Sequence, residues 1–226
     1  MSESQAQLEK VGPNYDREQM LAVRRKTLDA VQSIARAVQP GMLEEEAVEA
    51  ARQILKGAGL LRGWHGIKVR FGENTLNVFS APSKPGVVLQ PNDIFFVDIG
   101  PVFQKWEGDA GDTFVVGGDA DMHRAARDVR SIFDLVQAKW RSEGLTGKAL
   151  YDYAVEQSEA LGWKLNLDTN GHRLSEFPHE AHYAGALATT DFKPTADLWV
   201  LEIQIRHPTR PFGAFYEDLL LDRSAG

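Results

Sequence analysis

The sequence contains no cysteine. This absence excludes disulfide bonds, thiolate metal ligands and cysteine nucleophiles, and it agrees with a reducing compartment. Any metal site in this chain must therefore use oxygen and imidazole ligands.

Two further absences exclude classes of binding partner. An excess of basic residues is lacking, because 25 lysines and arginines stand against 32 acidic residues and give a net charge of -7. A nucleic-acid or anionic-membrane binder would need a basic face to neutralise phosphates. No apolar run approaches the roughly 20 residues that span a bilayer, and the polar N-terminus lacks the apolar segment of a signal peptide. The sequence predicts a cytoplasmic protein whose partners include neither nucleic acid nor a membrane.

Apolar periodicity and turn residues predict the order of elements along the chain. Helices are expected at residues 16–38, 43–55, 119–142 and 146–161. Strands are expected at residues 67–71, 94–99, 112–116, 198–205 and 214–221. We expect a flexible leader over residues 1–15 and one domain over residues 16–226. The order helices, strands, helices, strands indicates an α+β fold whose two similar halves share one curved sheet, with helices on its outer face.

Acidic side chains interrupt four otherwise apolar strands. They are Asp98, Asp109 on the return strand of a hairpin, Glu202 and Glu217. Taken alone, Asp98 or Asp109 is better explained as a strand-end or turn-capping residue. Buried carboxylates without a cation are costly and repel one another. The four together therefore indicate a site that holds positive charge.

A polar loop over residues 170–182 contains three of the six histidines, His172, His179 and His182. Their spacing is not that of a zinc-protease helix, and each alone is better explained as a surface or hydrogen-bonded residue. Combined with the four carboxylates, one loop imidazole would complete a hard site suited to Mn, Co, Fe, Zn or Mg.

Taken in order, these pieces resemble the signature of the pita-bread metallopeptidases, the family of methionine aminopeptidase, aminopeptidase P and prolidase. The matching strings are Val97-Asp98-Ile99-Gly100, Gly108-Asp109 with Thr113-Phe114, Gly171-His172 with His179-Glu180, Glu202, and Glu217-Asp218. The resemblance is closest to stand-alone catalytic domains of the Xaa-Pro peptidase type. It implies a pita-bread fold with two pseudo-symmetric halves that form a curved antiparallel sheet.

The resemblance also implies two divalent metal ions, Mn, Co, Fe or Zn. Asp98 would bind one ion, His172 and Glu202 the other, and Asp109 and Glu217 would bridge the two. The ions would activate a water molecule for attack on an amide carbonyl.

Further roles follow from the same resemblance. Glu202 would shuttle a proton, His179 would hydrogen-bond the substrate carbonyl or the developing oxyanion, and Thr113 would lie behind the ligands.

Three positions depart from the family pattern. The family usually has a histidine before the first metal-binding Asp that protonates the leaving amine, whereas residues 77–82 contain none here and no histidine occurs between His65 and His123. Our hypothesis is that His65 enters the site in its place; the alternative is a surface or packing role. Asp112 replaces a usual arginine, and Phe215 stands where Xaa-Pro members tend to have another arginine.

The predicted function is a dinuclear-metal-dependent aminopeptidase-type hydrolase that acts on the N-terminal residue of peptides or dipeptides, Xaa-Pro-like or methionine-aminopeptidase-like. The alternative is a pita-bread binding module, or a non-peptidase metalloenzyme that has lost peptidase turnover. Degenerate binding modules often lose metal ligands, so the presence of all five favours an enzyme over a binding module, although a non-peptidase reaction on the same two metals would keep them too. The expected partner is a peptide or small amide substrate, and a homodimer is considered for the chain itself.

Overall fold

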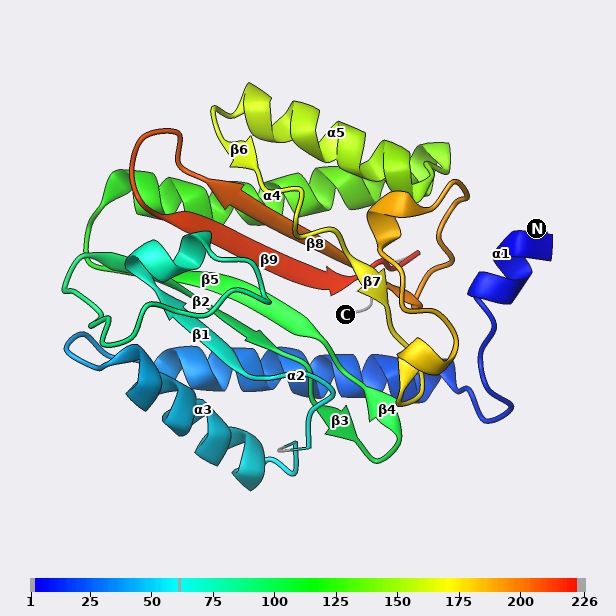
Figure 1. The fold of residues 1–226 in the computed structure, drawn as a ribbon, viewed down its shortest axis with the longest axis horizontal. Coiled ribbons are helices and arrows are strands. Elements are labelled where there is room, and N and C mark those ends of the chain that lie inside the picture. The colour runs from blue at the N-terminus through cyan, green and yellow to red at the C-terminus, as the bar shows by residue number, and fades with distance from the viewer. Residues whose placement is uncertain (1–2, 61, 223–226) are drawn as a thin grey trace.

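The structure is a computed structural model that describes residues 3–60 and 62–222. Two helix pairs, one in each half of the chain, flank the sheet (Figure 1). The pairs are α2 (Arg17–Ala37) with α3 (Glu44–Gly57), and α4 (Ala120–Glu143) with α5 (Gly147–Ala160). The side chains of Asp16, Asp119 and Thr146 accept hydrogen bonds from N–H groups in the first turns of α2, α4 and α5, which satisfies donors that a helix cannot pair internally. The four predicted helices are confirmed.

Seven strands of the described residues form the main sheet, in the order β1-β2-β5-β9-β8-β6, with β7 paired to β8. Their bounds are β1 (Lys68–Phe71), β2 (Asp93–Ile99), β5 (Ala110–Val116), β6 (Lys164–Leu165), β7 (His172–Arg173), β8 (Trp199–Arg206) and β9 (Gly213–Leu219). All neighbouring strands are antiparallel. The five predicted strands are confirmed, whereas the two-residue strands β6 and β7 carry too little periodicity to be predicted.

The remaining elements are short. A hairpin of β3 (Val102–Phe103) and β4 (Trp106–Glu107) connects β2 to β5, and the helix α1 (Glu3–Leu8) precedes α2. The described residues also form three 3-10 helices: η1 (Gly72–Leu76), η2 (His179–Ala181) and η3 (Leu187–Thr189). No helix among the described residues is both long and apolar enough to cross a membrane.

The two halves repeat one arrangement, in which two helices are followed by several strands, and the last strand of each half lies at the middle of the sheet. β5 closes the first half and β9 the second, and the two pair at the centre, where Gly111 faces Glu217. The α2–α3 pair packs on β1 and β2 through residues such as Ile34, Ala51 and Phe95. A separate core beneath α4 and α5 is formed by apolar side chains such as Val136, Trp140 and Leu201. The predicted α+β architecture of two similar halves sharing one antiparallel sheet is confirmed.

The described part of the segment expected as a flexible leader contacts the second half of the domain. Glu9 is buried, and its Oε1 accepts hydrogen bonds from the indole Nε1 of Trp199 at 2.8 Å and from the backbone N of Thr195 at 2.7 Å. The guanidinium of Arg173 donates to the carbonyl oxygens of Leu8 and Glu9 at 3.1 and 3.2 Å. The polar sequence of this segment suggested fraying, but a buried carboxylate with several donors around it holds Glu9 against the domain.

Candidate metal centre

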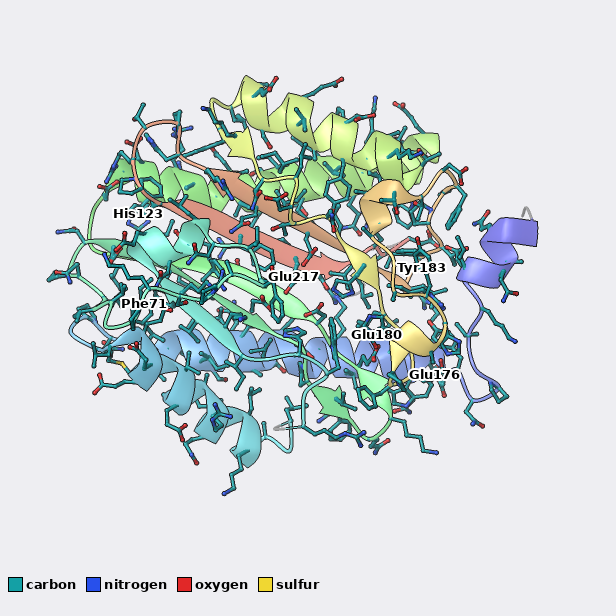
Figure 2. The ribbon with its side chains drawn as sticks, in the orientation of Figure 1. Phe71, His123, Glu176, Glu180, Tyr183 and Glu217 are labelled. Atoms are coloured by element: carbon teal, nitrogen blue, oxygen red, sulfur yellow. The ribbon has the colours of Figure 1, made fainter. Side chains whose placement is uncertain are left out.

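Strand register places three of the predicted carboxylates in one row across the middle of the sheet. Asp98 on β2 faces Gly111 on β5, Gly111 faces Glu217 on β9, and Glu217 faces Glu202 on β8. Side chains of directly opposed residues project on the same face of a sheet. The three carboxylates therefore meet on one face, and Figure 2 shows Glu217 at the middle of the sheet.

Gly111 in the centre of this row leaves the space that the neighbouring side chains occupy. A Cβ atom there would lie 2.4 Å from the ring of Phe215 and 3.0 Å from Oε1 of Glu217. A larger residue at this position would push Glu217 out of the row. A glycine is thus required at this position, because the side chains of Phe215 and Glu217 approach its backbone closely.

Asp109 and His172 complete the set from outside the row. Asp109 directly precedes β5, and His172 lies on β7, opposite Val200 of β8. Nε2 of His172 is 2.8 Å from Oδ2 of Asp109. A cavity of about 290 Å³ is lined by all five predicted ligand residues and by His65 and His179. The structure thus brings together every site residue that the sequence singled out.

Two carboxylate oxygens in this cluster are buried and accept no hydrogen bond from the described residues. They are Oδ2 of Asp109 and Oε1 of Glu217. The approach of His172 to Oδ2 of Asp109 is short but lacks hydrogen-bond geometry. An orphaned buried acceptor costs about 1–3 kcal/mol. Because these are the two residues expected to bridge a pair of cations, their free lone pairs fit that role.

The pKa shifts of the clustered carboxylates indicate a site suited to bind positive charge. Burial, opposed in part by His65, raises the pKa of Asp98 to about 7. Burial and then the charge of Asp109 raise the pKa of Glu217 well above its ordinary value. Burial would also raise the pKa of Asp109, but His172 and His65 lower it to about 2. Without a bound cation, Asp98 and Glu217 are driven toward their protonated, neutral forms, while Asp109 keeps its charge beside His65 and His172.

His65 lies inside the cluster. Its Nε2 is 3.2 Å from Oδ1 of Asp109 and 3.6 Å from Oδ1 of Asp98. The ring packs edge-on against Trp64 and Phe79, with centroid separations of 4.3 and 4.9 Å. Phe79 belongs to the segment from which the usual histidine is missing, so the imidazole of His65 reaches the site from a different part of the chain.

Two residues with structural roles at the site were missed by sequence reasoning. The carboxylate of Glu107 is fully buried and accepts a hydrogen bond from Nδ1 of His179 at 2.9 Å. The indole of Trp64 packs against the rings of His65, His172 and His179, at centroid separations of 4.3, 5.0 and 4.7 Å. Glu107 carried a weak signal, as an acid two residues before Asp109 in a short hairpin. Trp64 carried none.

The residues that depart from the family pattern lie at the edge of the site or outside it. Asp112 pairs with Arg130 of α4 at 2.7 Å, so its charge is compensated away from the cavity. Phe215 packs on Phe96, with ring centroids 5.2 Å apart.

The hydroxyl of Thr113 donates to the carbonyl of Phe215 and accepts from its N–H, at 2.7 and 2.8 Å. Thr113 therefore joins β5 to the strand that carries Glu217.

The chain resembles a known protein family over most of its length. Residues 18–221 match the model of metallopeptidase family M24. No curated protein sequence matches the chain.

Solved structures with the same fold include a methionine aminopeptidase from Thermotoga maritima, at 19% identity and a TM-score of 0.70, with 99% of this chain and 95% of that chain covered. A dipeptidase from Pyrococcus horikoshii matches at 18% identity and a TM-score of 0.78, covering 98% of this chain and 61% of that one. A prolidase from the same organism matches at 17% identity and a TM-score of 0.70, covering 98% and 60%.

These comparisons bear on the fold. The predicted pita-bread architecture is confirmed, because the model of the family covers most of the chain and the solved structures superpose over nearly all of it. The chain spans about 60% of the length of the prolidase and dipeptidase chains that it matches.

Proposed function

This chain belongs to metallopeptidase family M24, and from that premise we propose that it hydrolyses the amide bond after the N-terminal residue of peptides, using two divalent metal ions. The observation that carries the proposal is the convergence of Asp98, Asp109, His172, Glu202 and Glu217 on one cavity.

The donor set fits two cations. Asp109 and Glu217 each have one buried oxygen without a hydrogen-bond partner, which suits a bridging position. Asp98 would complete the pocket of one ion, and His172 with Glu202 that of the other. Oxygen and imidazole ligands of this kind suit Mn, Co, Fe or Zn. When bound, the pair of ions would supply an acidified water and stabilise an oxyanion.

The chain's own residues would handle the proton and the substrate. Glu202 is only partly buried, and its Oε2 accepts a hydrogen bond from the backbone N of Gly171 at 2.6 Å, which fixes the carboxylate at the cavity wall. We expect this carboxylate to hold the proton that the attacking water loses. Because Nδ1–H of His179 is committed to Glu107, Nε2 is the nitrogen left for the substrate. A hydrogen bond from Nε2 to the substrate carbonyl requires the doubly protonated ring, in which both nitrogens are donors.

The charge of the cavity favours the amino end of a substrate. Among the described residues, its lining contains no lysine or arginine, whereas Asp168 and Glu180 add acid to the wall. Lys68 and Arg70 line an adjoining pocket of only about 20 Å³, and Arg70 is occupied by the backbone carbonyls of residues 77–79 and 81. A free carboxylate next to the scissile bond would thus meet no lysine or arginine of the cavity lining; the nearby ammonium of Lys68 lies over the ring of Phe79. We therefore expect longer peptides to be better substrates than dipeptides.

A matched peptide series tests the proposal. Metal-stripped protein supplied with Co²⁺ or Mn²⁺ should release the first residue from a tripeptide faster than from the corresponding dipeptide. It should leave the N-acetylated tripeptide intact, because the amino group that the acidic cavity recognises is blocked. Glu202→Gln should lose this activity, while His123→Ala, an imidazole loss on α4 away from the cavity, should keep it.

Two outcomes would contradict the proposal. Peptide binding in the presence of metal, without release of any residue, would support a binding module that has lost turnover. Metal binding without either peptide binding or peptide cleavage would support a non-peptidase metalloenzyme.

A further inference from the structure

His65 and His172 have matching environments on opposite sides of Asp109. Nε2 of His65 is 3.2 Å from Oδ1 of Asp109, and Nε2 of His172 is 2.8 Å from Oδ2. Each imidazole thus approaches a different oxygen of the same buried carboxylate. Of these two histidines, the resemblance to the family assigned a metal-binding role only to His172.

The other ring nitrogen is also held in the same way in both residues. Nδ1 of His65 lies 2.8 Å from the carbonyl oxygen of Gly66, and Nδ1 of His172 lies 2.8 Å from the carbonyl oxygen of Arg173. A carbonyl oxygen can only accept, so Nδ1 carries the proton in each case. In the neutral ring, Nε2 then presents a lone pair, and a backbone carbonyl on Nδ1–H is the arrangement common among metal-binding histidines.

A lone pair directed at carboxylate oxygens requires a proton or a metal cation between them. Nε2 of His65 faces two such oxygens, at 3.2 Å from Asp109 and 3.6 Å from Asp98. Ligand atoms about 2.0–2.2 Å from one cation are roughly 3.0–3.6 Å apart. The side chains of His65, Asp98 and Asp109 are 8%, 9% and 1% exposed, so little solvent competes for the position.

The structure contains two groups of potential ligands that share Asp109. One is His65, Asp98 and Asp109, and the other is Asp109, His172 and Glu217; in each group the ligand atoms lie within 4.8 Å of one another. We propose that His65 is a ligand of the metal ion at Asp98, so that each of the two ions has one imidazole. The inference rests on the two-ion site of the proposed function.

This role differs from the sequence hypothesis, in which His65 protonates the leaving amine. A nitrogen that binds a cation through its lone pair has no proton to donate. Packing between Trp64 and Phe79 fixes the plane of the ring, but packing alone does not direct Nε2 at two carboxylates. An imidazole in both pockets also favours Zn, Co or Fe over Mg.

Metal binding measured independently of turnover tests the inference. Wild type, His65→Ala, His65→Gln and the control His123→Ala would be stripped of metal and titrated with Co²⁺ by equilibrium dialysis, with the visible absorption spectrum recorded at each step. Wild type and His123→Ala should bind two Co²⁺. Both His65 variants should bind one Co²⁺ normally and the other at least about 100-fold more weakly, since loss of a residue that merely supports a ligand already costs about 10–100-fold. Their spectra should show the loss of a nitrogen ligand.

His172→Ala provides the complementary control, because it should weaken the other ion and leave the ion at His65 in place. Melting curves in a chelator establish that each variant is folded, and the glutamine variant keeps much of the volume of the ring.

Other results would overturn the inference. His65 variants that bind two Co²⁺ with wild-type affinity and spectrum would exclude a ligand. Loss of turnover in that case would establish the proton donor, and unchanged turnover would establish a packing role. A wild type that binds no Co²⁺ would contradict the proposed function and this inference with it, whereas two-ion binding that survives the loss of His65 would contradict this inference alone.

Discussion

Glu107 offers a direct test of how the loop that carries His179 is held. Its carboxylate is fully buried and accepts three hydrogen bonds from that loop. Oε2 accepts from the backbone N of Ser175 at 3.1 Å and from Nδ1 of His179 at 2.9 Å, and Oε1 accepts from the backbone N of His179 at 2.9 Å. One side chain thus fixes both the backbone of the loop and the orientation of the imidazole.

The cost of removing this carboxylate follows from the number of donors left unpaired. Each buried donor without a partner costs about 1–3 kcal/mol, so Glu107→Ala should lose at least about 3 kcal/mol of unfolding free energy. Glu107→Gln can keep two acceptor contacts through its carbonyl oxygen, but its amide nitrogen would face the third donor. It should lose about 1–3 kcal/mol. Against a total stability of about 5–15 kcal/mol, both losses are measurable.

Denaturant unfolding of the metal-stripped proteins measures these losses, because bound metal would mask them. Glu180→Ala is the matched control. Its side chain is 49% exposed and lies 3.7 Å from Nε2 of His179, so its removal should change stability by no more than about 0.5 kcal/mol.

Turnover gives a second readout of Glu107. With metal restored, Glu107→Gln should lower kcat more than it changes KM, because a misoriented His179 would fail in the transition state. Wild-type stability and turnover in Glu107→Ala would refute the reasoning.

Three further predictions concern metal, pH and the N-terminal segment. Co²⁺ at 100 times its dissociation constant should stabilise metal-stripped protein by about 2.7 kcal/mol, and Glu217→Gln should reduce the resulting rise in Tm; a wild-type Tm indifferent to metal would count against the two-ion site. The carboxylates of Asp98 and Asp109, opposed by burial, raise the pKa of His65 from 6.5 to about 9, and Asp109 has the same effect on His172. The folded metal-free protein therefore keeps protons that the unfolded chain releases, so its Tm should fall as pH rises from 6.5 to 9, and a rise over that range would contradict this charge state. Glu9→Ala should lose about 2–4 kcal/mol of unfolding free energy, because it leaves buried donors unpaired; an unchanged denaturation midpoint would show that the segment contributes nothing to stability.

The sequence by itself determined the elements and the set of acids. Helix periodicity and turn residues predicted the helices closely, because these signals act within a few residues of one another. Acids such as Asp98 and Glu217 were visible because a charge in an apolar strand is conspicuous without any knowledge of neighbouring strands.

Only the tertiary structure decided which of these groups meet and in which direction they point. The pairing of Gly111 with Glu217, which joins the two halves, links residues far apart in the chain. The contact of Glu107 with His179 spans 72 residues, and that of Glu9 with Trp199 spans 190. Local patterns describe propensity and burial, whereas such contacts depend on strand order, register and side-chain direction, which are set when the two halves pack.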